Sequence, residues 1–541
     1  MKSVVKSPEP ARFRRDVEVL KVLLLLVLSA AAGWASAAKL GIGFGPGAVI
    51  AGCIFGVSLF SMIKLRGAPR EMGFTFGLKF FSVTAYKVLN VTLVLWLAND
   101  MGFKYADALH LVVVWAIIMS VSTLLAGSIT DALGLRRTLL IGVSLCVLTR
   151  LIMVVTSNPA VALAAGLFPL AIGEALCTPV LVAALRRFAL PSQRSVAFSV
   201  FYAIMNFGFM VGYFVFDGVR RATDADGLVN VPFLSGDISA YRTLLLVSMC
   251  IELFMLPLIL LIRRGAEMTE NGLVVTEEEI KYPDAGFFKS VGLTVRDAAL
   301  SIVSLFSGLV KTSGFYRLLM FLMFIGFLKV VFNVMDYVLP PFAIQELGDN
   351  AGVGSLNAIN GILILVLAPA IGIMTRKYSA YSMVILGGFI TAFSFVFMFT
   401  PHAAYQGLAD GWVGRVIGHG YLGLTGAVHP YYVMIAFWQI VFSLGEAFYS
   451  PRVYEYASSI APKGQEASYA SLSYVPLLIG KLITGAAFGG LLARYCPAEG
   501  QRNPEMMWLI IGLMVLVAPV GLLVFKRYIR VKEEGRENSA I

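Results

Sequence analysis

Long apolar stretches are the feature that most limits what this chain can fold into. We identify fourteen stretches of about 20 apolar residues, and about 20 residues is the length that a helix needs to cross a bilayer. Hydrophobic residues make up 58% of the chain and charged residues 14%, whereas a soluble domain is about half apolar and a quarter charged. This composition excludes a soluble enzyme, a disordered protein and a disulfide scaffold.

The predicted spans form an N-terminal hairpin and a core of two sets of six helices. The hairpin spans cover 19–38 and 45–63, and the core spans cover 79–98, 109–130, 138–157, 161–184, 196–217, 243–262, 318–343, 353–374, 381–400, 431–451, 468–493 and 505–526. We therefore predict an all-α polytopic membrane protein with 14 spans. Its parts are the N-terminus with the hairpin (1–78), the first bundle (79–262), a cytoplasmic linker (263–317), the second bundle (318–526) and a cytoplasmic tail (527–541).

The basic residues predict the orientation of these spans. A net charge of +11 would suggest nucleic acid in a soluble protein. Here most of the 43 Lys and Arg residues fall in segments that are cytoplasmic when both termini are placed there, as the positive-inside rule requires. We expect an integral protein of the inner (plasma) membrane, in contact with the bilayer and without a nucleic-acid partner. The segment ending near Ala35-Ser36-Ala37 also resembles a cleaved signal peptide, whose loss would leave the other spans in the same orientation.

The linker between the two sets of spans has two interpretations. Residues 270–285 are acidic and polar, whereas residues 287–310 carry apolar side chains on alternate turns. The second segment fits an amphipathic helix on the inner membrane surface. A solvated linker explains the same residues equally well.

An internal repeat indicates that one six-helix unit occurs twice. The segments Gly173–Pro179 and Gly445–Pro451 share four identities at a spacing of 272 residues, and Gly208 and Gly480 have the same spacing. A weaker pair, which begins at Gly127 and Gly372, is 245 residues apart. The long loop 401–430 accounts for the difference. Two parallel six-helix repeats predict a transporter with its site near the midplane.

Eight ionisable residues lie well inside the predicted spans, where each would cost about 2.5–3.5 kcal/mol on a lipid-facing helix. They are Lys87, Arg150, Glu174, Glu252, Lys329, Asp336, Glu446 and Lys481. Polar residues at helical spacing accompany several of them, such as Asn333 beside Lys329 and Asp336, Tyr474 beside Lys481, the pair Tyr202 and Asn206, and the pair Asn357 and Asn360. A substrate or proton pathway explains the charged set, while polar contacts between helices explain a single Asn. Arg150 and Glu252 have no polar residues at helical spacing beside them, so they are the best candidates for a structural role.

At this point the residues resemble a known group of transporters. The twelve-helix core is similar to the major facilitator superfamily, and residues 127–137 resemble the loop motif of that superfamily. The resemblance implies that Asp131 and Arg136 brace helix ends during conformational change. The alternative for Arg136 is that its charge only helps to set the orientation of the spans in the membrane. Residues 198–208 and 445–463 resemble the proton-dependent oligopeptide transporter family. This resemblance implies that Glu446 meets a substrate amino group. The chain departs from that family at 80–87, which lacks its ExxER motif, and at Thr178, where the family often has Lys.

These observations predict a secondary active transporter that works by alternating access. We expect proton-coupled symport of a small polar or zwitterionic solute, peptide-like or carboxylate-bearing, by a monomer. The alternative is a proton-antiport exporter of drugs or metabolites. The expected substrate-binding residues are Lys87, Tyr202, Asn206, Lys329, Asn333, Asn360, Glu446, Tyr474 and Lys481, and the expected proton-coupling residues are Glu174, Asp336 and Glu446. No GxxxxGK[ST], HExxH or GxSxG sequence occurs, so we predict no enzyme activity, cofactor or metal.

Overall fold

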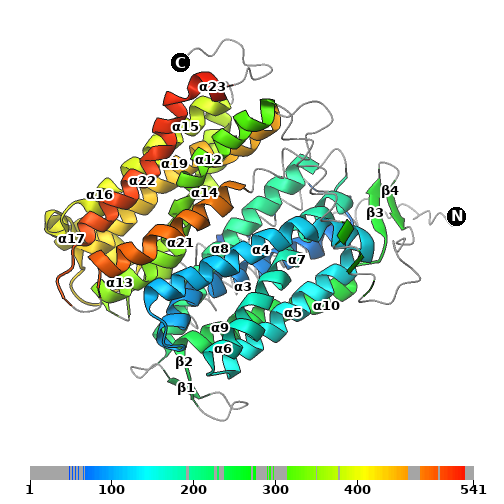
Figure 1. Cartoon of the computed structure of the whole chain (residues 1–541), viewed down its shortest axis with the longest axis horizontal. Helices are drawn as coiled ribbons and strands as arrows, with labels where there is room; N and C mark the ends of the chain where they lie inside the picture. The colour runs from blue at the N-terminus through cyan, green and yellow to red at the C-terminus, as the bar shows by residue number, and fades with distance from the viewer. Residues whose placement is uncertain are drawn as a thin grey trace, which may run out of the picture.

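The computed structural model shows a helical protein built from two groups of long helices (Figure 1). It describes residues 67–190, 194–223, 228–230, 237–269, 272–275, 313–348, 350–375, 378–460, 475–497 and 500–530, together with isolated residues between 48 and 65 and between 289 and 297. The predicted hairpin spans 19–38 and 45–63 and the predicted amphipathic segment 287–310 lie almost entirely outside these residues. Within them, eleven helices are long and apolar enough to cross a membrane.

The first group of helices runs from residue 70 to residue 261. Its elements are α3 (Arg70–Asn99), α4 (Tyr105–Leu133), α5 (Leu135–Val155), the continuous run of α6 (Pro159–Val161), η1 (Ala162–Leu167) and α7 (Phe168–Phe188), α8 (Arg194–Ala222), α9 (Ala240–Leu253) and α10 (Met255–Leu261). Each coincides with a predicted span, usually with a few more residues at each end. The extensions occur because hydrogen bonding within the helix continues past the apolar stretch into the interfacial residues.

The second group runs from residue 313 to residue 529. Its elements are α12 (Ser313–Asn333), η3 (Val334–Val338), α13 (Leu339–Leu347), α14 (Val353–Met374), α15 (Ala380–Ser394), α16 (Val396–Phe399), α19 (Pro430–Ile460), α21 (Val475–Tyr495), α22 (Pro504–Val524) and α23 (Lys526–Ile529). The predicted span 468–493 corresponds to α21, and its first residues lie outside the described part of the chain. The long loop contains the short helices η4 (His402–Tyr405), α17 (Gln406–Asp410), α18 (Trp412–Gly414) and η5 (Arg415–Tyr421).

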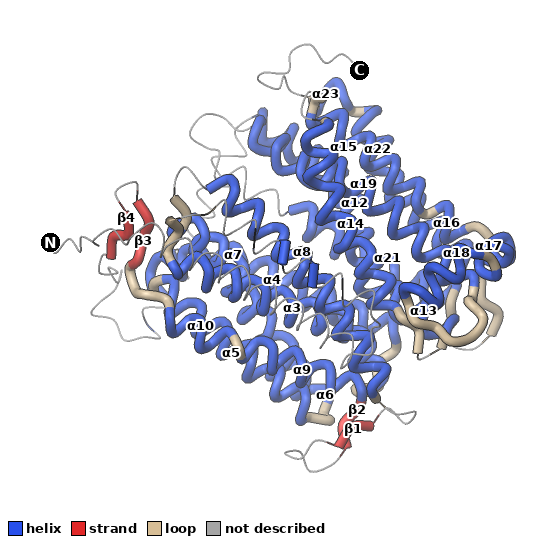
Figure 2. Tube along the Cα trace, turned by 180° about the vertical axis from the view of Figure 1, so that it is seen from behind, coloured by secondary structure: helices blue, strands red, loops and turns tan. Residues whose placement is uncertain are grey.

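Two short hairpins, which the all-α prediction omits, lie outside the spans. Strand β1 (Leu228–Asn230) pairs with β2 (Asp237–Ser239), and β3 (Ala266–Thr269) pairs with β4 (Gly272–Val275), both antiparallel (Figure 2). The second hairpin pairs Thr269 with Gly272, and Asn271, which precedes Gly272 in the sequence, is a residue type common in turns. Both hairpins are too short to change the helical class of the fold.

The same helix–helix contact occurs in both groups, at the spacing of the sequence repeat. A methyl group on Gly142 of α5 would lie 3.1 Å from the carbonyl oxygen of Gly173 on α7. In the second group, a methyl group on Gly387 of α15 would lie 2.6 Å from the carbonyl oxygen of Gly445 on α19. The α5 and α15 glycines are 245 residues apart and the α7 and α19 glycines 272. Close backbone packing through paired glycines is common between membrane helices, and here it relates one bundle to the other.

The two bundles pack together mainly through α8 against α14 and through α4 against α21. We call the side where α3 begins the Arg70 face and the side where α3 ends the Asn99 face. The closest approaches lie toward the Asn99 face, where added methyl groups on Gly485 and Gly489 of α21 would lie 2.8 Å from Val113 and 3.1 Å from Ala106 of α4. In Figures 1 and 2 the bundles diverge toward the Arg70 face. The structure is therefore a state closed at the Asn99 face.

Candidate functional site

A π-helical turn positions the acidic residue at the centre of the bundle interface. The helix that begins as α12 widens at η3, where the backbone N–H of Leu339 donates to the carbonyl of Val334. Pro340 and Pro341 follow directly, and neither can donate the hydrogen bond that an α-helix would need there. Single π-turns occur frequently at functional sites. This one carries Asp336 toward the first bundle.

Within the described part of the chain, the carboxylate of Asp336 is held by side chains of the first bundle. The Nζ of Lys87 on α3 lies 2.8 Å from Oδ2 and 3.0 Å from Oδ1 of Asp336. Asn90 of α3 donates to Oδ2 at 2.7 Å, and the hydroxyl of Tyr213 on α8 donates to Oδ1 at 2.7 Å. The hydroxyl of Tyr337 in turn donates to Asn90 Oδ1 at 2.6 Å. We call this set the Asp336 clasp.

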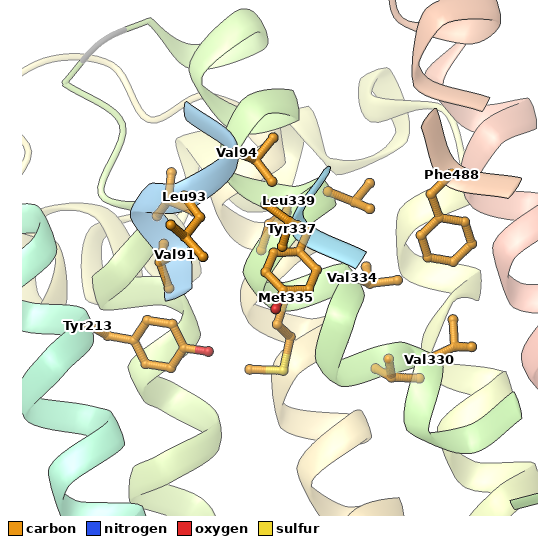
Figure 3. Close-up of a cluster of buried hydrophobic side chains, with 14 of the residues drawn as sticks. Val91, Leu93, Val94, Tyr213, Val330, Val334, Met335, Tyr337, Leu339 and Phe488 are labelled. Atoms are coloured by element: carbon orange, nitrogen blue, oxygen red, sulfur yellow. The ribbon is translucent and has the colours of Figure 1, made fainter. Parts of the chain in front are cut away.

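The Asp336 clasp lies among apolar side chains that keep water from it. Figure 3 shows Tyr213 and Tyr337 on facing segments, with Met335 and Val334 beside them. The side chains of Lys87 and Asp336 are each 9% exposed. Lys87 also lies over the rings of Phe209 and Tyr213, 4.7 and 4.9 Å from their centroids. The charge pair is therefore strongly bound in this state and costly to separate without a change in charge.

A second polar cluster lies inside the second bundle. Lys329 of α12 donates to Ser450 Oγ of α19 at 3.1 Å, and Asn360 of α14 donates to Glu446 Oε2 at 2.8 Å. The exposed fractions of Lys329 and Glu446 are 6% and 3%, and the two do not form an ion pair. Asn333 donates to Thr484 Oγ1 of α21 at 3.0 Å. This cluster holds one cation and one carboxylate, each bound to neutral partners.

The other predicted binding residues are more widely distributed. Tyr202 is 36% exposed on α8, and its carbonyl accepts a bond from Asn206 at 3.0 Å. The Nζ of Lys481 lies over the ring of Trp115, 5.9 Å from the centroid, and forms no ion pair with a described carboxylate. Tyr474 and the side chain of Asp131 lie outside the described residues. Arg136 donates to the carbonyl of Ile262 at 3.3 Å.

Glu174 lies away from the interface, in a buried ion cluster of the first bundle. Arg150 of α5 pairs with Glu174 of α7, and its Nη1 lies 3.6 Å from Oε2 of Glu252 on α9. All three residues are at most 4% exposed. The candidate ligand atoms of Cys146, Cys177 and Glu252 lie within 4.8 Å of one another, and Arg150 supplies positive charge beside them.

The repeat gives the acid of the second bundle a different partner. Glu446 stands 272 residues after Glu174, and Phe395 stands 245 residues after Arg150. The ring of Phe395 packs on Trp438 and Trp508. Because no arginine occupies this position, Glu446 is bound only by the amide of Asn360 among the described residues.

Several residues of the site were missed in the sequence analysis. Tyr213 lies seven residues after Asn206 and so continues the polar stripe of α8. Asn90 follows Lys87 by three residues on α3 and shares its face. Lys79, at the edge of a predicted span, is 2% exposed and lies 5.0 Å from the centroid of Phe201. Extending each stripe to the end of its helix would have identified the first two.

Comparison with known proteins identifies the family. A sequence model of the Major Facilitator Superfamily matches residues 75–418. The chain belongs to the Major Facilitator Superfamily. Members of this superfamily are transporters and not enzymes. No curated protein matches this chain in sequence.

Solved structures similar to this superfamily member include several peptide transporters. A peptide transporter POT in complex with sulfate has 16% sequence identity and a TM-score of 0.62, covering 85% of this chain and 95% of its own. The same transporter with a substitution, in complex with alafosfalin, has 16% identity and a TM-score of 0.62, with 88% and 99% covered. A bacterial homologue of the human drug peptide transporters PepT1 and PepT2 has 16% identity and a TM-score of 0.59, with 85% and 99% covered. At this identity the likeness establishes the fold.

Proposed function

We propose that this superfamily member is a proton-coupled symporter of a small polar or zwitterionic solute, either peptide-like or carboxylate-bearing. The observation that carries the proposal is the Asp336 clasp. A buried carboxylate of one bundle is held by three donors of the other, one of them a lysine. The bundles cannot separate at the Asn99 face without breaking these bonds, so the charge state of this carboxylate controls the movement.

Proton coupling follows from the cost of separating these charges. Leaving Asp336 ionised and without its donors inside the protein would carry a large desolvation penalty. A proton on the carboxylate removes the attraction to Lys87 and lowers that penalty. We propose that protonation of Asp336 permits opening at the Asn99 face, and that loss of the proton allows the clasp to form again. In this proposal Lys87 is the counter-charge of the clasp and contacts substrate only when the clasp is open.

The polar cluster of the second bundle supplies the proposed substrate site. Glu446 offers a carboxylate for an amine, and Lys329 offers an ammonium group for a carboxylate. Neither is neutralised by an ion pair among the described residues, so a solute with both charges would satisfy both. Asn333, Asn360 and the stripe of Tyr202 and Asn206 would add hydrogen bonds. Lys481 is a further cation near the interface, which favours a substrate bearing a carboxylate.

We propose a structural role for Glu174 in place of the expected role in proton coupling. Its carboxylate is bound by Arg150 inside one bundle, whereas the proposed movement separates two bundles. Asp131 and Arg136 remain proposed braces at the Arg70 face. We further propose that both termini and the Arg70 face are cytoplasmic, so that the Asn99 face points away from the cytoplasm.

Transport by reconstituted protein tests the proposal. Proteoliposomes with an imposed proton gradient are screened with dipeptides, amino acids, nucleosides and organic anions. We expect accumulation in the direction of proton flow, loss of accumulation in Asp336→Asn with retained exchange of internal for external solute, and loss of both in Glu446→Gln. Asp410→Asn is the matched control, because Asp410 is exposed and, among the described residues, is bound by Gln406 of its own helix. Solute movement opposite to the proton flow would instead support the exporter, and the absence of any proton-driven movement would refute both.

A further inference from the structure

A second buried carboxylate crosses the interface in the opposite direction to Asp336. Asp217, near the end of α8, is 1% exposed. Its Oδ1 accepts from the backbone N–H of Gly354 at 2.8 Å, and its Oδ2 accepts from the backbone N–H and the hydroxyl of Ser355, both at 2.6 Å. Asp336 belongs to the second bundle and is held by the first, whereas Asp217 belongs to the first bundle and is held by the second.

Two of the three donors of Asp217 are free backbone N–H groups at the start of a long helix, and the third is the hydroxyl of Ser355. Helix α14 begins at Val353, and Gly352, its N-cap residue, provides no side-chain cap of its own. The first N–H groups of a helix have no partner within it, and the helix dipole favours an anion at this end. The cap that α14 lacks in its own sequence therefore comes from the other bundle.

Glycine makes this approach sterically feasible. A methyl group on Gly354 would collide with the carbonyl oxygen of Tyr213 and lie 2.9 Å from Oδ1 of Asp217. A methyl group on Gly352 would lie 3.0 Å from a guanidinium nitrogen of Arg221. The start of α14 is thus shaped to receive the end of α8.

Neighbouring bonds join the same two segments and the long loop. Arg220 donates to the carbonyl of Ala351, and Arg221 donates to the carbonyl of Leu422, both at 3.3 Å. The hydroxyl of Tyr421 donates to the carbonyl of Ser355 at 2.7 Å. Tyr421 and Leu422 belong to the loop 401–430, whose length distinguishes the second repeat from the first. The extra residues of that loop lie beside the capped end of α14.

The equivalent contact in the other half of the repeat carries no charge. The residue 272 positions after Asp217 is Gly489 of α21, which packs against Ala106 of α4. The contact between α4 and α21 therefore forms without a carboxylate, whereas the matching contact between α8 and α14 contains one. The Asp217 contact is an addition to the architecture and not a requirement of it.

We infer that Asp217 is a positioning residue that holds the Asn99 face closed by capping α14 across the bundle interface. Separating α8 from α14 removes the cap and costs the charge-assisted bonds, so the contact sets the ratio of closed to open molecules. All three donors lie in the outermost helical turn, so entering water can replace them when the face opens. The inference rests on the alternating access of the proposed transporter, but closure is measurable without substrate.

Distances between spin labels test the inference. Labels on cysteines introduced at Ala160 and Ala404, in a background without native cysteines, report the Asn99 face. Labels at Arg186 and Tyr378 report the Arg70 face. In Asp217→Asn we expect the open-to-closed ratio at the Asn99 face to rise by about tenfold or more, with a matching decrease of the distance at the Arg70 face. Ser355→Ala, which removes only the hydroxyl donor, should shift both distances in the same directions by about two- to fivefold.

The same label distances are measured in a control variant, and they also define the results that would overturn the inference. Asp410→Asn lies on the Asn99 face outside the contact and should leave both distances unchanged. Wild-type distances in Asp217→Asn would overturn the inference. Broadened distances at both faces, with a lower melting temperature and no reciprocal change, would show a purely structural residue and would also overturn it. These distances require no proton gradient, so a failure of the symport proposal would leave this result interpretable.

Discussion

Replacement of Asp336 by Asn tests the central step of the proposed mechanism without a change in side-chain shape. The substitution removes the negative charge that faces Lys87 at 2.8 Å. It also replaces one acceptor oxygen by an NH₂ group, which cannot accept from either the lysine or its neighbours. The variant imitates the protonated carboxylate, so we expect it to favour the state that is open at the Asn99 face.

The size of the effect follows from the burial of the pair. Removing one member of a buried ion pair costs about 3–5 kcal/mol, and about 1.4 kcal/mol corresponds to a tenfold change in an equilibrium constant. Full loss would thus shift the ratio of states by roughly 100- to 4,000-fold. Lys87 keeps the Tyr213 hydroxyl at 3.3 Å and two ring contacts, which reduces the loss. We therefore expect a shift of at least about tenfold.

The assay is the pair of label distances described above. Wild-type protein should be closed at the Asn99 face, and Asp336→Asn should be open there. Adding Lys87→Met should restore part of the closed population, because the uncompensated cation is then removed; the double-mutant cycle measures the coupling. A closed distance distribution in Asp336→Asn, the same as that of the wild-type protein, would refute the reasoning.

Three further substitutions separate structural from functional residues. Glu174→Gln should lower the melting temperature, at a cost of about 3–5 kcal/mol, because Arg150 loses its closest partner, yet proton-driven transport should persist; a wild-type melting temperature would contradict this assignment. Gly354→Ala should open the Asn99 face in label distances, whereas Gly490→Ala, which has open space around it, should not; equal distances in the two would argue against a steric role. Burial, and secondarily the charge of His402, lowers the pKa of His429 in the folded protein. Its contribution to stability is therefore present above the unfolded pKa of about 6.5 and is lost as the pH falls below that value and through the lowered pKa. His429→Gln should therefore flatten the decrease in melting temperature between pH 7 and pH 5, and an unchanged slope would show that other groups cause it.

The sequence predicts the core spans within the described residues well, because a single physical requirement determines them, whereas the two hairpin spans stay a prediction. A bilayer demands long apolar helices whose backbone groups bond within the helix, and that demand is visible residue by residue. The two repeat spacings also relate the contact of Gly142 with Gly173 to that of Gly387 with Gly445. The all-α prediction does not contain the hairpin of β3 and β4, whose strands are only four residues long.

The partners across the interface are much harder to predict. Asp336 is evident as a charge inside a span, but its contact with Tyr213 depends on how two bundles pack and on a π-turn that rotates the side chain. Asp217 lies at the very end of a predicted span. A charge at that position has a small free-energy cost of membrane insertion, so it does not indicate a functional residue. Its partners include the backbone N–H groups of Gly354 and Ser355. Every residue except proline has such a group, so the sequence does not indicate which ones bind Asp217.

The exchange of Arg150 for Phe395 between the two repeats has a consequence for how the halves divide their work. In the first copy the acid on α7 is paired with Arg150 of its own bundle. In the second copy an aromatic ring fills the same place, and the matching acid on α19 is left to an amide. In the proposed mechanism, this exchange of one residue leaves the acid on α19 available to a substrate amine, whereas the acid on α7 is already paired.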